Sequence, residues 1–205
     1  QGLHTKMVQI AMREFGLTSD RVRITATTTG KVPNTSATAA SSGADLNGMA
    51  VLDAITKIKR RMIAFAAEKW NVAEEDVQFL PDGVHVGLEV VTFQQLAWQV
   101  YFARISLSSN GFYRTPKISW DPATGRGRPF FYFAYGAACA EVSVDLLTGE
   151  NTMDRVDILH DAGQSLNPDI DIGQIEGGFV QGAGWLTMEE LVWDPASRLR
   201  THAPS

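Results

Sequence analysis

The chain has 205 residues, of which 44% are hydrophobic and 20% are charged, and its formal net charge is −5 at pH 7. This composition is typical of a soluble globular protein, and without a basic excess we expect no nucleic-acid partner. Only one cysteine is present, which excludes an internal disulfide framework, and no apolar run approaches the ~18 residues of a membrane span, so we expect no membrane partner.

Apolar residues at helical spacing predict two amphipathic helices in the first third of the chain. One runs from Leu3 to Phe15 and ends near Gly16, and the other runs from about Leu46 to Phe65. Between them, Arg21 to Thr27 alternates in the manner of a half-buried strand. A basic cluster of the second helix, Lys57 and Lys59 to Arg61, falls largely on its solvent side.

The middle of the chain predicts a hairpin followed by a helix. Val77 to Val86 forms the hairpin, turned at Pro81-Asp82-Gly83, and Thr92 is a suitable N-cap for a helix from Phe93 to Arg104. Ile105 to Tyr113 is then expected to be a strand. Asp121 to Pro129 is expected to be a surface loop because proline and glycine recur in it.

The last third predicts a second hairpin and a glycine-containing helix. The predicted elements are strands over Phe131–Leu146 and Thr152–Asp161, a helix over Ile172–Trp185 and a short strand over Glu190–Trp193. The expected fold class is α+β, with mixed or antiparallel sheets and hairpins packed against amphipathic helices. We expect two subdomains: residues 1–105 with a helix-strand-helix pattern, and residues 106–205 with the hairpins and the glycine-rich helix.

A run of small residues is the most informative stretch of the sequence. Thr35 to Ala44 contains only Thr, Ser, Ala and Gly. One interpretation is a flexible linker. The other is a cradle for an anionic ligand, because tiny side chains before a helix N-terminus leave backbone N–H groups accessible, and Ser36, Ser41 and Ser42 add hydroxyl donors.

Two glycine-containing segments are weaker candidates of the same kind. Gln1-Gly2-Leu3 opens the first helix, and Gly2 allows a close backbone approach. Gly173, Gly177 and Gly178 fall near one face of the last helix, beside Gln174 and Gln181. Since each helical glycine costs roughly 1 kcal/mol relative to alanine, they indicate either close helix packing or a flat ligand.

No other pattern predicts a catalytic or metal site. The four histidines are scattered without metal-ligand spacing, and Glu189-Glu190 suits a solvated edge. Cys139 lies in a strand, where a free cysteine is usually a small buried hydrophobic residue. From the residues alone, the prediction is an α+β domain with a cradle for an anion or a cofactor.

At these same residues the sequence resembles the molybdopterin-binding domain of the xanthine dehydrogenase and aldehyde oxidase family. The resemblance extends over nearly the whole chain and is carried by Gln1–Lys6, Val32–Gly48, Gly111–Pro116, Phe131–Gly136, Ser165–Pro168 and Ile172–Gly177. The Pro-Asn-Thr-Ser run and the Phe-Tyr-Arg-Thr-Pro segment are most similar to the large, molybdenum-binding subunit of bacterial xanthine dehydrogenases.

The resemblance assigns cofactor binding to residues from three parts of the chain: Gln1, Gly2, Ala40, Ser41, Ser42, Gly43 and Gln174. It places Ala40 near the molybdenum through its backbone and not as a side-chain ligand. It also makes Ala39 and Ala40 adjacent to the bound purine.

The resemblance implies hydroxylation of a heteroaromatic carbon, with hypoxanthine and xanthine oxidised to urate in purine catabolism. The family's catalytic base is a glutamate in a Gly-Glu-Pro-Pro segment, which this sequence lacks, since Gly149-Glu150 is followed by Asn151. We therefore expect no catalytic residue in this chain, which would be an excised part of a larger enzyme and inactive alone.

The resemblance further implies molybdopterin as the cofactor, with 2Fe-2S clusters and FAD in other domains or subunits. The expected partners are the rest of the molybdenum-binding subunit, an FAD/iron-sulfur subunit and a purine or related heterocycle, in the cytoplasm. Two alternatives stay open: a related hydroxylase that acts on aldehydes, carbon monoxide or other N-heterocycles such as nicotinate, and a non-enzymatic binding or assembly module.

Overall fold

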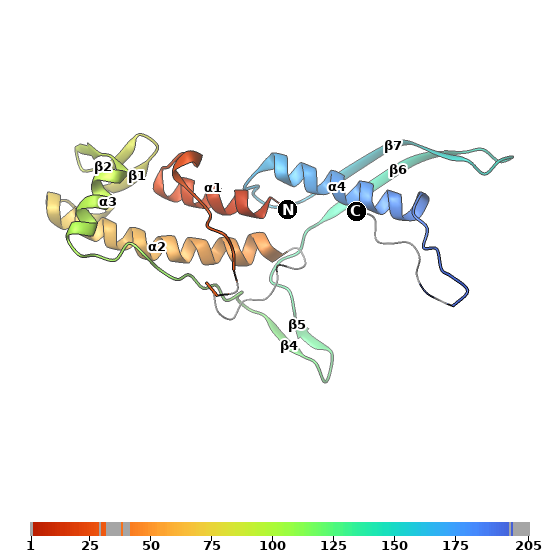
Figure 1. Cartoon of the computed structure of the whole chain (residues 1–205), viewed down its shortest axis with the longest axis horizontal. Coiled ribbons are helices and arrows are strands. Elements are labelled where there is room, and N and C mark those ends of the chain that lie inside the picture. The colour runs from red at the N-terminus through yellow and green to blue at the C-terminus, as the bar shows by residue number, and fades with distance from the viewer. Residues whose placement is uncertain (1, 29, 32–37, 39–41, 197, 199–205) are drawn as a thin grey trace. The chain divides into compact units, whose positions relative to one another are not determined.

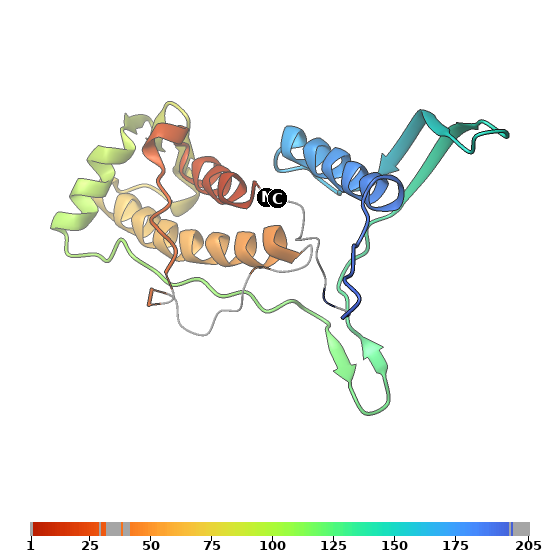
Figure 2. The ribbon, with the colours of Figure 1, turned by 45° about the vertical axis from the view of Figure 1, so that its right-hand side comes forward.

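The computed structural model describes residues 2–28, 30, 31, 38, 42–196 and 198, and their contacts divide the chain into two compact units. The first unit is Gly2–Phe131 and the second is Tyr132–Ser205. The described residues form helices and antiparallel strands (Figure 1 and Figure 2), and both kinds of element occur in each unit, which confirms the predicted α+β class.

Two paired helices form one side of the first unit, as predicted. They are α1 (Leu3–Phe15) and α2 (Gly43–Trp70). Helix α1 ends at Gly16, whose φ of +65° favours glycine. A Cβ at Gly16 would also lie 2.3 Å from the Leu80 carbonyl oxygen, so this glycine allows α1 to end directly against the neighbouring strand.

A small antiparallel sheet and a third helix complete the core of the first unit. The elements are the 3-10 turn η3 (Glu74–Asp76), β1 (Val77–Leu80), β2 (Gly83–Val86), β3 (Glu89–Val91) and α3 (Phe93–Phe102), with the strands in the order β1-β2-β3. The predicted hairpin is confirmed, whereas β3 was not predicted. Thr92 caps α3 in a capping box: its hydroxyl accepts from the Gln95 N–H, and the Gln95 side chain accepts from the Thr92 N–H.

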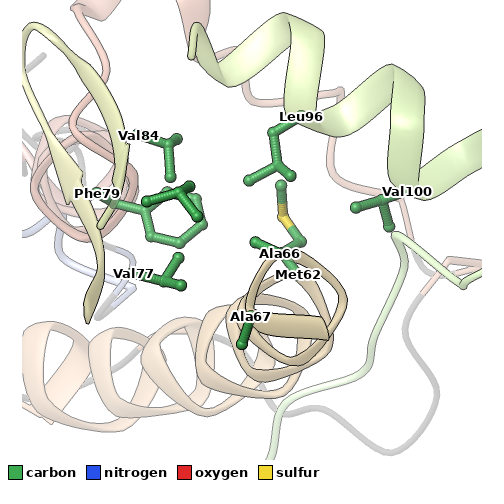
Figure 3. Packing of buried hydrophobic residues seen from close by; sticks show 9 residues of the cluster. Met62, Ala66, Ala67, Val77, Phe79, Val84, Leu96 and Val100 are labelled. Carbon is green, nitrogen blue, oxygen red and sulfur yellow. The ribbon is translucent and has the colours of Figure 1, made fainter. Parts of the chain in front are cut away.

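The hydrophobic core lies between this sheet, α2 and α3 (Figure 3). Alternate residues of the strands point inward, because side chains of a strand alternate between its two faces. The buried residues of the core are Met62, Ala66 and Ala67 of α2, Val77, Phe79, Val84 and Val86 of the sheet, and Leu96 and Val100 of α3. The core therefore fixes the C-terminal half of α2 against the sheet and leaves its N-terminal half to contact α1.

Replacing Leu96 with alanine should destabilise the first unit strongly. Leu96 is fully buried, and removing a buried leucine side chain costs about 2–5 kcal/mol of unfolding free energy. Leu88 is the matched control, because it is 105% exposed and its replacement should change stability by less than about 0.5 kcal/mol. Urea unfolding followed by circular dichroism measures both variants, and equal midpoints would contradict the assigned core.

Three predictions for the first unit are wrong. The predicted strand Arg21–Thr27 is absent: Arg21 ends the 3-10 turn η1 (Ser19–Arg21), and the residues after it belong to no helix or strand. Residues 105–113 likewise form no strand. Conversely, the predicted loop at 121–129 contains part of a short hairpin, β4 (Ser119–Asp121) with β5 (Arg126–Arg128). Local alternation favours extended backbone but does not supply the partner that makes a strand.

The second unit consists of a two-stranded ribbon and one helix. The ribbon pairs β6 (Gly136–Val144) with β7 (Asn151–His160), as predicted, with a bulge at Glu141/Val142. Helix α4 (Pro168–Thr187) begins four residues before the prediction, because the Asn167 side chain accepts from the Ile170 N–H and caps it. The predicted strand at 190–193 is absent apart from a single bridge residue, Trp193.

The second unit has almost no interior of its own. Among its described residues only Gly184 is buried, while Leu146, Trp185 and Leu186 are 95%, 73% and 84% exposed. The prediction that Cys139 is buried is therefore wrong, because the ribbon that carries it has both faces uncovered. An isolated two-stranded ribbon is marginal in water, so this unit needs a covering surface. In the described part of the chain, no helix is both long enough and apolar enough to cross a membrane.

Candidate functional site

The N-terminal ends of α1 and α2 lie together in the first unit. Gly48 of α2 packs against Met7 and Ile10 of α1, and a Cβ at Gly48 would lie 3.1 Å from Ile10 Cδ1. Further along, Lys59 Nζ is 3.2 Å from Glu14 Oε2. Residue numbers thus rise in the same sense along both helices, so the helices are parallel and both begin at the same end (Figure 1).

Gly43 opens α2 at this end and leaves little room for a side chain. A Cβ at Gly43 would lie 3.1 Å from Leu3 Cδ2 and 3.1 Å from Thr38 Cγ2, which is tighter than ordinary packing. Leu3 begins α1, and Thr38 belongs to the run of small residues. The structure therefore brings together the starts of both helices and one residue of that run.

Both helices begin without a side-chain cap. Gly2 precedes α1 in the left-handed conformation with φ +70°, and the Ser42 side chain makes no capping hydrogen bond to α2. The first N–H groups of any helix lack intrahelical acceptors, and the helix dipole adds partial positive charge there. The first turn of α1 contains no acidic residue and that of α2 contains only Asp45. Two such ends side by side suit an anionic group such as a phosphate.

Three of the predicted cofactor residues lie at this end of the first unit. Gly2 and Ser42 directly precede the two helices, and Gly43 is the first residue of α2. Four other predicted residues fall outside the described residues: Gln1, Ala39, Ala40 and Ser41.

Gln174 lies in α4 of the second unit, and its side chain is exposed. The glycines around it have open space: a Cβ at Gly173, Gly177 or Gly178 would meet nothing within 4 Å among the described residues. Within the second unit, no described backbone therefore approaches this face of α4. Both explanations for these glycines, close helix packing and a flat ligand, stay predictions.

The basic cluster of α2 is involved in more contacts than the sequence indicated. Lys57 and Arg61 reach the backbone of the extended segment 108–112, and Lys59 pairs with Glu14 and lies 5.3 Å from the centroid of the Phe79 ring. Lys57 and Arg60 are exposed, as predicted, whereas Lys59 and Arg61 are half-buried. The signal that could have found Lys57 and Arg61 is their four-residue spacing from Asp53 along one face of α2.

The described residues contain no group of three or more His, Cys, Asp or Glu side chains that could hold a metal ion. A hollow of about 480 Å³ lies beside α3, lined by Arg21, Trp98 and Tyr101 among others, and includes none of the predicted cofactor residues. The chemical features of this site are therefore backbone N–H groups and small side chains. Such a site can bind and orient an anionic or planar cofactor.

The chain matches a known protein family over its entire length. Residues 1–205 match the family model described as the molybdopterin cofactor-binding domain. The chain is 47% identical over 208 residues to xanthine dehydrogenase of Dictyostelium discoideum and 46% identical over 205 residues to xanthine dehydrogenase/oxidase of Mus musculus. Each match covers 100% of this chain and 14% of the relative, so the chain spans about one seventh of their length.

Solved structures with low identity show the same fold. The reconstituted CO dehydrogenase from Oligotropha carboxidovorans matches with a TM-score of 0.77 and 24% identity, over 97% of this chain and 24% of that one. Quinoline 2-oxidoreductase from Pseudomonas putida 86 matches with a TM-score of 0.76 and 23% identity, over 98% and 25%. With a family match over every residue and 46–47% identity to two xanthine dehydrogenases, this chain belongs to the molybdopterin cofactor-binding domain family.

Proposed function

We propose that this chain is the part of a molybdenum hydroxylase that helps to hold the molybdenum cofactor, and that the enzyme is a xanthine dehydrogenase. The observation that carries the proposal is the identity of 46–47% to xanthine dehydrogenases over the whole chain. The substrates would be hypoxanthine and xanthine, oxidised to urate in purine catabolism. When bound, the cofactor would supply the redox chemistry of the hydroxylation.

The chain would contribute backbone donors and free space to the cofactor. Gly2, Ser42 and Gly43 suit this because the two helix ends offer N–H groups, and a Cβ at Gly43 would crowd Leu3 and Thr38. The proposed set also includes Gln1, Ala40, Ser41 and Gln174. A cofactor with an anionic phosphate fits the charge of two adjacent helix N-termini.

Substrate recognition would use two alanines of the run of small residues. Ala39 and Ala40 would lie beside the purine, with the Ala40 backbone near the metal, and neither would transfer a proton. The base of the family is a glutamate in a Gly-Glu-Pro-Pro segment, which this sequence lacks. The work proposed for this chain is to bind, to orient and to exclude water.

The remaining parts of the enzyme would come from other segments. The chain covers 14% of the two xanthine dehydrogenases, so we propose that the rest of the molybdenum-binding subunit and a part with FAD and 2Fe-2S clusters complete it. A cytoplasmic location belongs to the same proposal. Aldehydes or other N-heterocycles are the second substrate class, and the identity of 46–47% to xanthine dehydrogenases favours purines over them.

The 205-residue chain alone is expected to show no xanthine-dependent dye reduction, whereas the enzyme assembled with its other parts should show it. Elemental molybdenum and pterin fluorescence of the assembled enzyme are measured alongside. An assembled enzyme without molybdenum would contradict the proposed function. Turnover of an aldehyde but not of xanthine would shift the substrate class, and turnover by the chain alone would mean that the missing base is not required.

A further inference from the structure

Three polar side chains of α2 hold the backbone of the extended segment Ser108–Phe112. The residues follow one another at four-residue intervals, so they lie on one face of the helix. Each contact joins a side chain of α2 to a main-chain atom: Arg61 Nη2 donates to Ser108 O at 2.8 Å, Lys57 Nζ donates to Asn110 O at 3.3 Å, and Phe112 N donates to Asp53 Oδ2 at 3.0 Å. The helix therefore fixes where the backbone of the segment lies through contacts with main-chain atoms of the segment.

Asp53 is the centre of this arrangement. Its Oδ2 also accepts a hydrogen bond from Lys57 Nζ at 2.6 Å. The Lys57 ammonium first, and the Phe112 N–H second, lower the pKa of the Asp53 carboxyl below its usual value. Asp53 thus stays ionised at neutral pH, when it can accept from both donors.

Gly111 brings the segment into direct backbone contact with α2. A Cβ at Gly111 would lie 1.8 Å from the Ala50 carbonyl oxygen and 2.9 Å from the Ala54 nitrogen. Both partners are main-chain atoms of a helix, which cannot move aside. A side chain at position 111 would force the segment away from α2.

The segment runs antiparallel to α2 and toward the start of that helix. Ser108 is held at Arg61 and Phe112 at Asp53, so rising numbers along the segment meet falling numbers along α2. In Figure 1 and Figure 2 the chain that leaves α3 runs alongside α2 in the direction of the N-terminal end of that helix. Phe112, which is bonded to Asp53, is 78% exposed, and Arg114 makes no hydrogen bond or ion pair with the described residues.

Only Asp53 and Lys57 form an ion pair here, and an exposed ion pair contributes little to stability. The other contacts are directed at main-chain atoms of the segment, so their main effect is on its position. We propose that Asp53, Lys57 and Arg61 are positioning residues, which hold Phe112–Pro116 as part of the wall of the cofactor site at the start of α2. This inference rests on the proposed function. Phe112 and Arg114 would then present an aromatic ring and a guanidinium toward that site.

The test uses the assembled enzyme with Asp53→Leu, Asp53→Asn and Lys69→Met. Asp53→Leu removes the acceptor for the Phe112 N–H, whereas Asp53→Asn keeps an acceptor oxygen. Lys69→Met is the matched control, because Lys69 bonds Gln99 at 2.7 Å from the same helix without touching the segment. Hydrogen exchange of the peptide 108–116, molybdenum content, kcat and KM for xanthine are measured for each.

Asp53→Leu should speed exchange of this peptide and lower kcat/KM by about 10- to 100-fold, the scale of a small misplacement in a site. Asp53→Asn and Lys69→Met should stay within about twofold of the unsubstituted enzyme. The inference would be overturned if Asp53→Leu had the same exchange and the same kcat/KM as Lys69→Met. Faster exchange of the Asp53→Leu peptide with unchanged kinetics would also overturn it.

Should Asp53→Leu fail to fold, Lys57→Met is judged by the same criteria. An unsubstituted enzyme without molybdenum would instead contradict the proposed function, while the exchange measurement still tests the contact with α2.

Discussion

Replacing Ala40 with leucine is expected to abolish purine oxidation by the assembled enzyme. The proposal puts the Ala40 backbone near the molybdenum and Ala39 beside the purine, so a leucine side chain would fill space that substrate needs. A displacement of about 1 Å at a reacting centre can cost roughly 100-fold in rate, and we expect a loss of at least that size. Xanthine-dependent dye reduction and molybdenum content measure the effect.

Ala64→Leu is the control for this substitution, because Ala64 is exposed on α2 far along the helix from its start. It makes the same chemical change without crowding the proposed site, and it should leave turnover unchanged. Neither variant should shift the thermal midpoint appreciably. Normal turnover by Ala40→Leu would refute the placement of this loop beside the cofactor.

Replacing Gly111 with alanine should release the extended segment from α2. The added Cβ would lie 1.8 Å from the Ala50 carbonyl oxygen, a distance that no relaxation of a side chain can relieve. The Phe112 N–H and the Asn110 carbonyl would then lose their partners on α2. We expect faster hydrogen exchange over 108–116 and a fall in kcat/KM at least as large as the about 10- to 100-fold proposed for Asp53→Leu.

Gly30→Ala is the control for the glycine substitution, since a Cβ at Gly30 would meet none of the described residues within 4 Å. Its exchange pattern and kinetics should match those of the unsubstituted enzyme. If Gly111→Ala also matched the unsubstituted enzyme, the close approach of the segment backbone to α2 would have no effect on the site.

Elements whose signals are local could be predicted from the sequence. The apolar spacing of α1, the Pro-Asp-Gly turn between β1 and β2, and the Thr92 cap of α3 each act within a few residues, and the structure contains all three. The strand predictions for residues 21–27 and 105–113 were wrong because alternation predicts extended backbone only. Whether such backbone finds a strand partner or a helix face depends on residues far away in the sequence.

The separate parts of the candidate site could be predicted from the sequence, but not that they lie together. Small residues before a helix indicated a cradle at Gly43, and the first helix indicated another at Gly2. That these two ends lie together follows from the packing of α1 on α2, which has no signature in either segment. The contacts of Asp53 with Phe112 were not predictable either, because a charged side chain on an amphipathic helix usually faces solvent.

The lack of an interior in the second unit determines what a calorimeter would record for this chain alone. Heat absorbed on unfolding comes from contacts that are lost, and the ribbon β6–β7 with α4 has few to lose. The transition would thus report the melting of the first unit, and a free energy for all 205 residues would be ill-defined. The free energy that orders the ribbon would come from its association with a covering surface. The extent of ordering would therefore depend on the concentration of the associating partner.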